Sequence, residues 1–436
     1  MGNGKHGLVQ RLQPQFKQLK AKLSPLIFLN LYSLSTRFIL FGIISHMLSS
    51  GDRDAFMHLY VAALFCSQLS DFGSRITFFV KLGQSGVSEK PKLAQNNASY
   101  KIIMTLLSWL VFVAYAVYTS KESQPLLIFT FMLFVGNVAV SDYNLHIIRS
   151  EKGLRRELFY TACENTALVL LYVLVSIFFP YPVTFAIALS AVALVRLRWS
   201  ATEANELIPH ARFVFDFQVW RDQLRSVSIT GFAGLAVILL VRGPVLVTPL
   251  FMSMDSIAYF LLIIMFLQLS QMFSTNIALY MFADLKGTQS NEENRNRQHW
   301  QILVALVVLG VLGFFVLWSM IDIIEFVFNL EWGGPHYAKL LLLACVPAIL
   351  LIDYFRFSSV SHSLEKLFLC TCSAGLAVFV FLLLVRPGQL LHDELVVISY
   401  TSCLYVAVGL YLFLSLIGRF GKSGGELSTD FSNQLS

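Results

Sequence analysis

The stretch LIFLNLYSLSTRFILFGIISHMLS, residues 26–49, is mainly apolar and carries one charge, Arg37, near its middle. Its length matches the roughly 20 residues that a helix needs to cross about 30 Å of hydrocarbon. The residues before it are basic and polar, and the apolar run is too long for the core of a cleavable signal peptide. We therefore expect this stretch to be the first membrane-spanning helix and the insertion signal.

Similar apolar runs recur along the whole 436-residue chain, which is 56% hydrophobic and only 13% charged. A soluble domain carries about 25% charged residues, so the deficit indicates that lipid surrounds much of the surface. The sequence predicts an all-α polytopic membrane protein with about twelve transmembrane helices. Their predicted ranges are 26–49, 56–81, 101–119, 124–148, 158–179, 182–199, 227–250, 256–283, 302–320, 339–357, 366–386 and 394–418.

The distribution of basic residues predicts the orientation of these helices. If the N-terminus is cytoplasmic, most of the 32 Lys and Arg residues fall in cytoplasmic segments, as the positive-inside rule requires. The predicted outer loops then hold only Arg53, Lys121, Lys339 and Arg386. We therefore expect both termini in the cytoplasm, with tight turns at 51–54 and 180–182.

A hydrophilic segment at 200–226 divides the predicted helices into two groups of six. The expected organisation is an amphipathic N-terminal segment (1–25), an N-lobe with helices 1–6 (26–199), a cytoplasmic linker (200–226), a C-lobe with helices 7–12 (227–418) and a cytoplasmic tail (419–436). Apolar and basic residues alternate with helical spacing in the first segment, which suits a helix lying on an anionic leaflet. A cationic tail that only enforces topology is the alternative.

Arg37 is the deepest charge in the predicted spans. A charge at that depth is costly and usually faces the interior of a helix bundle or a watery cavity. Asn30, Ser33 and Arg37 follow one another at helical spacing and share one face. This polar face predicts a binding position for an anionic substrate.

Two further arginines fall inside predicted spans. Arg75 lies four residues after Asp71, so a private ion pair within one helix is the alternative to a binding role. Arg242 is followed by Gly243-Pro244, and a proline there can kink the helix beside the charge. A kink that only improves packing is the alternative to a moving gate.

Aligned polar side chains on three other spans suggest a wet cavity that contacts sugars or headgroups. Hydrogen bonding between helices is the alternative reading for each of them. Two acidic groups on the fourth and fifth spans could bind a coupling ion, or could pair with Arg149, Arg155 or Arg156. Asp71 is a further candidate for ion coupling. The candidate substrate-binding residues here are Asn137, Ser141, Asn144, Gln268, Gln271 and Ser274, and the candidate coupling residues are Asp142 and Glu164.

The sequence carries no catalytic signature. It lacks a phosphate-binding loop of the G-x-x-x-x-G-K-[ST] type, an H-E-x-x-H motif and a G-x-S-x-G motif. The longest predicted outer loop, about 321–338, is too short to fold as a catalytic domain. We therefore expect a transporter rather than an enzyme, with no metal, no cofactor and no nucleic-acid partner.

Two helical hairpins resemble those of a known family. The run from Phe38-Ile-Leu-Phe-Gly42 through Ser70-Asp-Phe-Gly73-Ser-Arg75 is similar to the first hairpin of the bacterial polysaccharide transport family, of the O-antigen flippase type. The run from Leu240-Val-Arg-Gly-Pro244 through Asp255-Ser-Ile-Ala-Tyr259 to Tyr280 resembles the start of that family's second lobe. The two hairpins cover roughly a quarter of the chain. The family belongs to the multidrug/oligosaccharidyl-lipid/polysaccharide (MOP) exporter superfamily.

The resemblance implies a flippase. Such proteins move an undecaprenyl-diphosphate-linked oligosaccharide, the repeat unit of O-antigen, capsule or exopolysaccharide, across the bacterial inner membrane by alternating access between two six-helix lobes. It also implies a basic central cavity, to which Arg37, Arg75 and Arg242 could contribute, contact with membrane lipid, and polymerase and chain-length proteins as partners in the same pathway. The chain lacks the two extra helices of the lipid II flippase branch.

Two alternatives stay open at this point. A cation-coupled multidrug exporter of the same superfamily would use Asp142 and Glu164, although fixed arginines should repel cationic drugs. A membrane polymerase or ligase for the same glycans would need acid, base or arginine residues in an outer loop, and only the segment at 321–338 is available.

Overall fold

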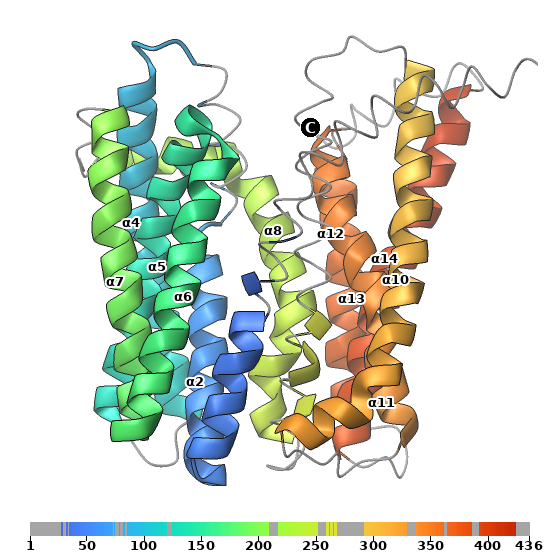
Figure 1. Cartoon of the computed structure of the whole chain (residues 1–436). Coiled ribbons are helices and arrows are strands. Elements are labelled where there is room, and N and C mark those ends of the chain that lie inside the picture. The colour runs from blue at the N-terminus through green and yellow to red at the C-terminus, as the bar shows by residue number, and fades with distance from the viewer. Residues whose placement is uncertain are drawn as a thin grey trace, which may run out of the picture.

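The computed structural model of the chain describes residues 28, 32–33, 35–72, 74, 78, 82, 85–119, 124–208, 217–251, 259–260, 262–264, 266–267, 292–328, 336–361, 364–385 and 392–423. Throughout these residues the regular secondary structure is helical, so the predicted all-α fold is confirmed. The helices run up and down in two bundles, one on each side of the molecule (Figure 1).

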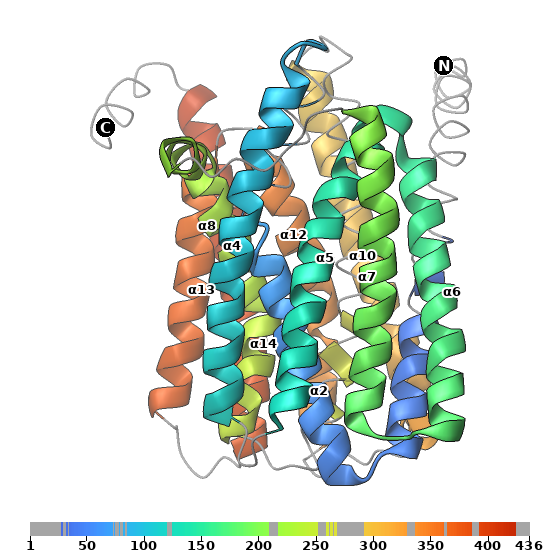
Figure 2. The same ribbon diagram turned by 90° about the vertical axis from the view of Figure 1, so that its left-hand side faces the viewer.

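The N-lobe is formed by the first half of the chain. Residues 35–47 are helical and are followed by α2, α4, α5, α6 and α7. α5 packs against α2, α4, α6 and α7 and is therefore the centre of this bundle (Figure 2). The bounds are α2 (Ser50–Leu69), α4 (Lys90–Thr119), α5 (Pro125–Lys152), α6 (Leu154–Phe178) and α7 (Pro182–Leu207).

The C-lobe is formed by the second half, in which α14 packs against α8, α11, α12 and α13. The long helix α10 packs against α11 and α12 on the outer side of the bundle (Figure 1). The bounds are α8 (Phe217–Phe251), α10 (Glu292–Phe328), α11 (His336–Leu343), α12 (Cys345–Ser361), α13 (Glu365–Val385) and α14 (His392–Ser423).

Eight of the described helical segments are long and apolar enough to cross a membrane. Their outward faces carry many large apolar side chains, such as Leu174, Phe315 and Leu384, which are 54%, 52% and 77% exposed. A surface of this kind is stable against lipid and costly against water. The chain is therefore a multi-pass membrane protein. The eight segments are Lys90–Thr119, Pro125–Lys152, Arg155–Phe178, Pro182–Leu207, His299–Phe328, His336–Arg356, Glu365–Val385 and Asp393–Ser415.

The two lobes meet along α8 and along the helix at 35–47. α8 packs against α12, α13 and α14 of its own lobe and against α2 and α4 of the N-lobe. On the other helix, the ring of Phe38 lies 4.1 Å from that of Phe266, and Phe41 meets the ring of Phe328 edge-on at 5.3 Å. The polar residues that share this helix therefore lie close to the junction between the lobes.

Several helices extend beyond their predicted spans, because apolar content marks the membrane and not the end of a helix. α4 begins eleven residues before the predicted start at 101, α7 continues past 199 to Leu207, and α8 begins at Phe217. Much of the predicted linker at 200–226 is therefore helical. The predicted outer loop at 321–338 is also helical in large part, since α10 ends at Phe328 and α11 begins at His336.

One predicted turn is wrong and one is confirmed. Residues 51–54 lie in the first turn of α2, where Ser49 is the N-cap and its hydroxyl accepts a hydrogen bond from the backbone N–H of Asp52. Asp52 near this N-terminus favours the helix over a loop, because it faces the positive end of the helix dipole. At 179–181 the chain does turn, and Pro182 begins α7.

Candidate functional site

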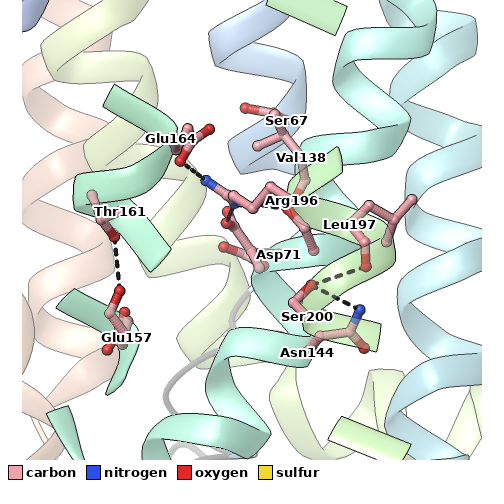
Figure 3. Close-up of polar contacts among 12 residues, drawn as sticks. Ser67, Asp71, Val138, Asn144, Glu157, Thr161, Glu164, Arg196, Leu197 and Ser200 are labelled. Carbon is pink, nitrogen blue, oxygen red and sulfur yellow. Dashed lines mark hydrogen bonds and ion pairs between the residues drawn. The ribbon is translucent and has the colours of Figure 1, made fainter. Parts of the chain in front are cut away.

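Arg196 of α7 joins three helices of the N-lobe in one polar cluster. Its Nε donates a hydrogen bond to the hydroxyl of Ser141 at 2.9 Å, and its Nη1 donates to Glu164 at 2.6 Å. Its Nη2 forms an ion pair with Asp142. Ser141 and Asp142 belong to α5 and Glu164 to α6, so each nitrogen of the guanidinium has its own acceptor. Figure 3 shows the side chain of Arg196 extending toward Glu164.

The cluster is largely shielded from the surroundings. The side chains of Arg196 and Glu164 are 11% and 13% exposed, whereas that of Asp142 is 36% exposed. At such depth an ion pair attracts more strongly than at a wet surface, but each charge also costs more to hold there. The pairing therefore explains how two carboxylates and a guanidinium are tolerated within helices that cross the membrane.

The predicted pairing of the two carboxylates is corrected by this geometry. Asp142 and Glu164 contact Arg196, whereas Arg149 pairs with Glu157 at 3.3 Å. Arg156 pairs with Glu203 at 2.9 Å instead. Both carboxylates are thus brought together, as a coupling site requires, but a guanidinium already lies between them.

Neutral hydrogen bonds on either side of the cluster join α5 to α7. The amide nitrogen of Asn137 donates to the backbone carbonyl of Ser190, and that of Asn144 donates to the hydroxyl of Ser200, both at 3.4 Å. The hydroxyl of Ser190 in turn donates to the carbonyl of Thr130 at 2.7 Å. These contacts favour the interhelical alternative for Asn137, Ser141 and Asn144 over a role in lining a cavity.

The face that carries Arg37 is tied to α6. The amide of the buried Asn165 donates to the hydroxyl of Ser33 at 2.7 Å, and Tyr32 is hydrogen-bonded to Thr166 at the same distance. Because Asn165 directly follows Glu164, α6 connects the Arg196 cluster to residues 32–33, which lie just before the helix at 35–47. Ser33 is therefore a contact to a neighbouring helix as well as a member of the predicted polar face.

Arg37 lies one turn further along this helix, with a partly buried side chain. Across the described residues, no carboxylate lies within salt-bridge distance of its guanidinium. One turn beyond it, Phe41 packs against Phe328 of α10 in the C-lobe. Arg37 therefore sits between a contact with α6 and a contact with the other lobe.

Asp71 contacts a neighbouring helix, and its predicted pairing with Arg75 falls on a residue outside the described part of the chain. Asp71 forms an ion pair with Lys101 of α4, whose side chain is only 4% exposed. Next to it, the hydroxyl of Tyr100 donates to the backbone carbonyl of Phe72 at 3.1 Å. The described contact of Asp71 therefore joins the end of α2 to α4.

Several predicted site residues lie outside the described part of the chain. The backbone of Arg242 belongs to α8, one turn beyond Ile238, but its side chain is not described. The others are Asn30, Arg75, Gln268, Gln271 and Ser274. Within the described residues, no group of three or more His, Cys, Asp or Glu side chains could hold a metal ion.

The sequence-based prediction missed Arg196. It lies in the last turn of the predicted span 182–199, where a basic residue is ordinarily a boundary charge. The stretch Ser200-Ala-Thr-Glu-Ala-Asn-Glu-Leu207 consists mainly of residues compatible with a helix and was the available signal that α7 continues. A longer helix moves Arg196 away from the end, to a level where it meets α5 and α6.

The sequence matches no protein-family model and no curated protein. Its fold, however, is similar to solved structures of MATE transporters. One is described as an inward-facing conformation of a multidrug resistance MATE family transporter of the MOP superfamily; it has a TM-score of 0.59 and 12% identity, and the match covers 90% of this chain and 96% of that one. Another, a MATE in complex with MaD5, has a TM-score of 0.54 and 12% identity, with 91% and 96% covered. The chain therefore shares the fold of MATE transporters of the MOP superfamily.

Proposed function

We propose that this chain is a membrane transporter that moves an undecaprenyl-diphosphate-linked oligosaccharide across the bacterial inner membrane. The two lobes would expose the substrate path to one side and then to the other, with both termini in the cytoplasm. The fold shared with MATE transporters supports the class of activity. The choice of an anionic, lipid-linked cargo rests on Arg37 and on the resemblance of the two hairpins to polysaccharide flippases.

The position of Arg37 is the observation that carries this proposal. A guanidinium within an apolar helix is costly unless it is paired or faces a polar path. Arg37 has no carboxylate partner among the described residues and lies beside the junction of the lobes. A site between two moving lobes is where an alternating-access transporter binds its substrate.

Arginine suits the headgroup of such a lipid. Its planar fork can donate two parallel hydrogen bonds to a phosphate, and its charge persists at any physiological pH. One such contact would hold a diphosphate firmly enough to select it, while leaving the sugars free to turn. The polyprenyl chain would stay in the surrounding lipid during the crossing. Membrane lipid, and the polymerase and chain-length proteins of the same pathway, are the proposed partners.

A cation-coupled multidrug exporter is the second candidate. It is favoured by one solved neighbour, which is described as a multidrug resistance transporter. The ion pairs of Asp142 and Glu164 with Arg196 argue against it, because they leave less negative charge for a coupling ion or a cationic drug. A polymerase or ligase is less well supported, since α10 and α11 occupy most of the segment from 321 to 338.

The test is a flipping assay with the full-length protein in proteoliposomes. The probe is a polyprenyl-diphosphate-linked sugar with a fluorophore on the sugar, and a membrane-impermeant quencher reports how much probe reaches the outer leaflet. We expect Arg37→Ala to slow translocation at least tenfold and Arg37→Lys to retain part of the rate. Arg155→Ala is the matched control, because Arg155 is exposed at the start of α6.

The assay also separates the candidates. An unchanged rate in Arg37→Ala would overturn the assigned role of Arg37. A wild-type protein that fails to move the glycan probe but exports a cationic dye would support the multidrug alternative. In cells, normal translocation together with failed polymerisation or ligation would favour the enzyme alternative.

A further inference from the structure

The Arg196 cluster contains more charge than is needed to join its helices. Neutral bonds already connect α5 and α7 on both sides of it, through Asn137 and Ser190 and through Asn144 and Ser200. Replacing a buried ion pair by well-packed uncharged residues is often neutral or stabilising. A purely structural contact at this level would therefore not require two carboxylates and an arginine.

The geometry of the guanidinium is that of a bound cation. Each of its three nitrogens contacts a different oxygen, from Ser141, Asp142 and Glu164. A hydroxyl and two carboxylates are also the kind of oxygen ligands that a small inorganic cation prefers. Here α5 and α6 hold these oxygen ligands from two sides, and the side chain of Arg196 from α7 fills the space between the ligands.

We propose that Arg196 is a resident counter-ion, which occupies the position between Asp142 and Glu164 that a mobile monovalent cation would otherwise take. The tethered charge offsets one of the two negative charges permanently. The N-lobe would then have the charge balance of a cation-loaded lobe without requiring Na⁺ from solution. Arg196 is thus assigned a role in ion dependence, and no role in substrate binding is assigned to it.

Only the role of Arg196 in the transport cycle depends on the proposed transport function. The cation affinity of the cluster can be measured without a cargo. The side chain of Asp142 is 36% exposed, so an ion can reach this carboxylate from outside the helices. The wild-type protein is therefore expected to bind Na⁺ weakly.

The experiment measures the binding of radiolabelled Na⁺ to the purified full-length protein, with choline as the competing salt. We expect Arg196→Met to bind Na⁺ at least tenfold more tightly than the wild type and to gain thermal stability as Na⁺ is added. Arg196→Lys should remain close to the wild type, because an ammonium group still supplies the charge. The triple variant Arg196→Met, Asp142→Asn, Glu164→Gln should lose the gained binding.

Two results would overturn the proposal. One is a folded Arg196→Met protein whose affinity for Na⁺ equals that of the triple variant, and the other is a wild type that binds Na⁺ as tightly as Arg196→Met. If Arg196→Met folds poorly, it is purified in Na⁺ and in choline, and rescue by Na⁺ alone supports the proposal while no rescue overturns it. A protein that follows the expected pattern but does not move the glycan probe would refute the proposed function alone.

Discussion

The imidazole Nε2 of His46 lies 3.0 Å from the backbone carbonyl oxygen of Val327, which joins the first described helix of the N-lobe to the last turn of α10 in the C-lobe. Val327 is the penultimate residue of α10, and the last carbonyls of a helix have no partner within it. Since a carbonyl can only accept, the imidazole donates this bond. The imidazole of His46 in the N-lobe therefore acts as a cap for the C-terminal end of α10 in the C-lobe.

This contact must break if the lobes part on that side of the molecule. We expect a cysteine pair at His46 and Val327, bridged by a short bifunctional thiol reagent, to stop translocation of the glycan probe. The pair is built on a background without the six native cysteines, and cleavage of the bridge should restore the rate. Each single cysteine with the same reagent is the control, and full activity after complete cross-linking would argue against movement there.

A second prediction concerns Glu203, a carboxylate only 6% exposed near the end of α7. It accepts hydrogen bonds from Arg156 at 2.9 Å and from Tyr160 at 2.5 Å, and pairs with Lys152 at 2.9 Å. Glu203→Ala leaves the buried Tyr160 hydroxyl without this acceptor. The side chains of Arg156 and Lys152 are 40% and 43% exposed, so water can solvate both cations after the substitution. We expect the free energy of unfolding to fall by about 1–3 kcal/mol.

The measurement is thermal or denaturant unfolding of the detergent-purified protein. Glu206→Ala is the matched control, because Glu206 lies one turn further along α7 and is exposed. It should change the free energy of unfolding by less than about 0.5 kcal/mol. Equal effects of the two substitutions would mean that the ion pairs around Glu203 contribute little.

Hydropathy was sufficient to predict an all-α membrane protein, because lipid admits so few backbone structures. Within the bilayer every backbone N–H and C=O must be satisfied, and a helix does this within one segment. Hydropathy was insufficient to place the ends of helices such as α4 and α7, because these helices continue beyond the lipid. The short turn at 179–181 was predictable, since Pro180 and Pro182 interrupt the helix on both sides.

The partners of the charged residues could not be predicted from the sequence. Asp142 and Glu164 were recognised as unusual, but their partner is 54 residues from one and 32 from the other. Nearby arginines such as Arg149 were therefore the apparent choices. Only the rotation of α5, α6 and α7 about their axes decides which charges meet, and the periodicity of a single helix does not give this rotation.

A third prediction concerns the hydroxyl of Tyr400, which donates to the backbone carbonyl of Val241 at 3.2 Å. Pro244 follows in the same helix and cannot donate to the carbonyl of Leu240, so the hydrogen-bond ladder of α8 is weakened at this level. The side chain of Tyr400 is fully buried, so water cannot replace its hydroxyl. We expect Tyr400→Phe to lower the free energy of unfolding by about 1 kcal/mol.

The same chemical change at Tyr405 serves as the comparison. Its hydroxyl donates to the carbonyl of Ala344 at 2.6 Å, but its side chain is 44% exposed. Tyr405→Phe should therefore lower the free energy of unfolding less than Tyr400→Phe does. Thermal unfolding measures the effect of both substitutions. A larger loss at Tyr405 than at Tyr400 would contradict the argument that burial sets the cost.

A final prediction concerns Gly231 of α8, which faces the end of α2. A Cβ atom at this position would lie 2.7 Å from the ring of Phe72 and 2.9 Å from its backbone carbonyl oxygen. The ring can turn, but the backbone of Phe72 has a φ of 26° and little freedom to adjust. We expect Gly231→Ala to lower the free energy of unfolding by about 1–3 kcal/mol, because the N-lobe and α8 must separate to admit the methyl group.

Gly409 of α14 provides the control, because a Cβ atom there would meet nothing within 4 Å. Gly409→Ala should be neutral or slightly stabilising, since alanine favours a helix by up to ~1 kcal/mol over glycine. Phe72→Ala combined with Gly231→Ala should recover only part of the loss, because the carbonyl contact at 2.9 Å remains. Full recovery would show that the ring alone keeps α8 at its distance, and an unchanged free energy in Gly231→Ala would show that the junction adjusts freely.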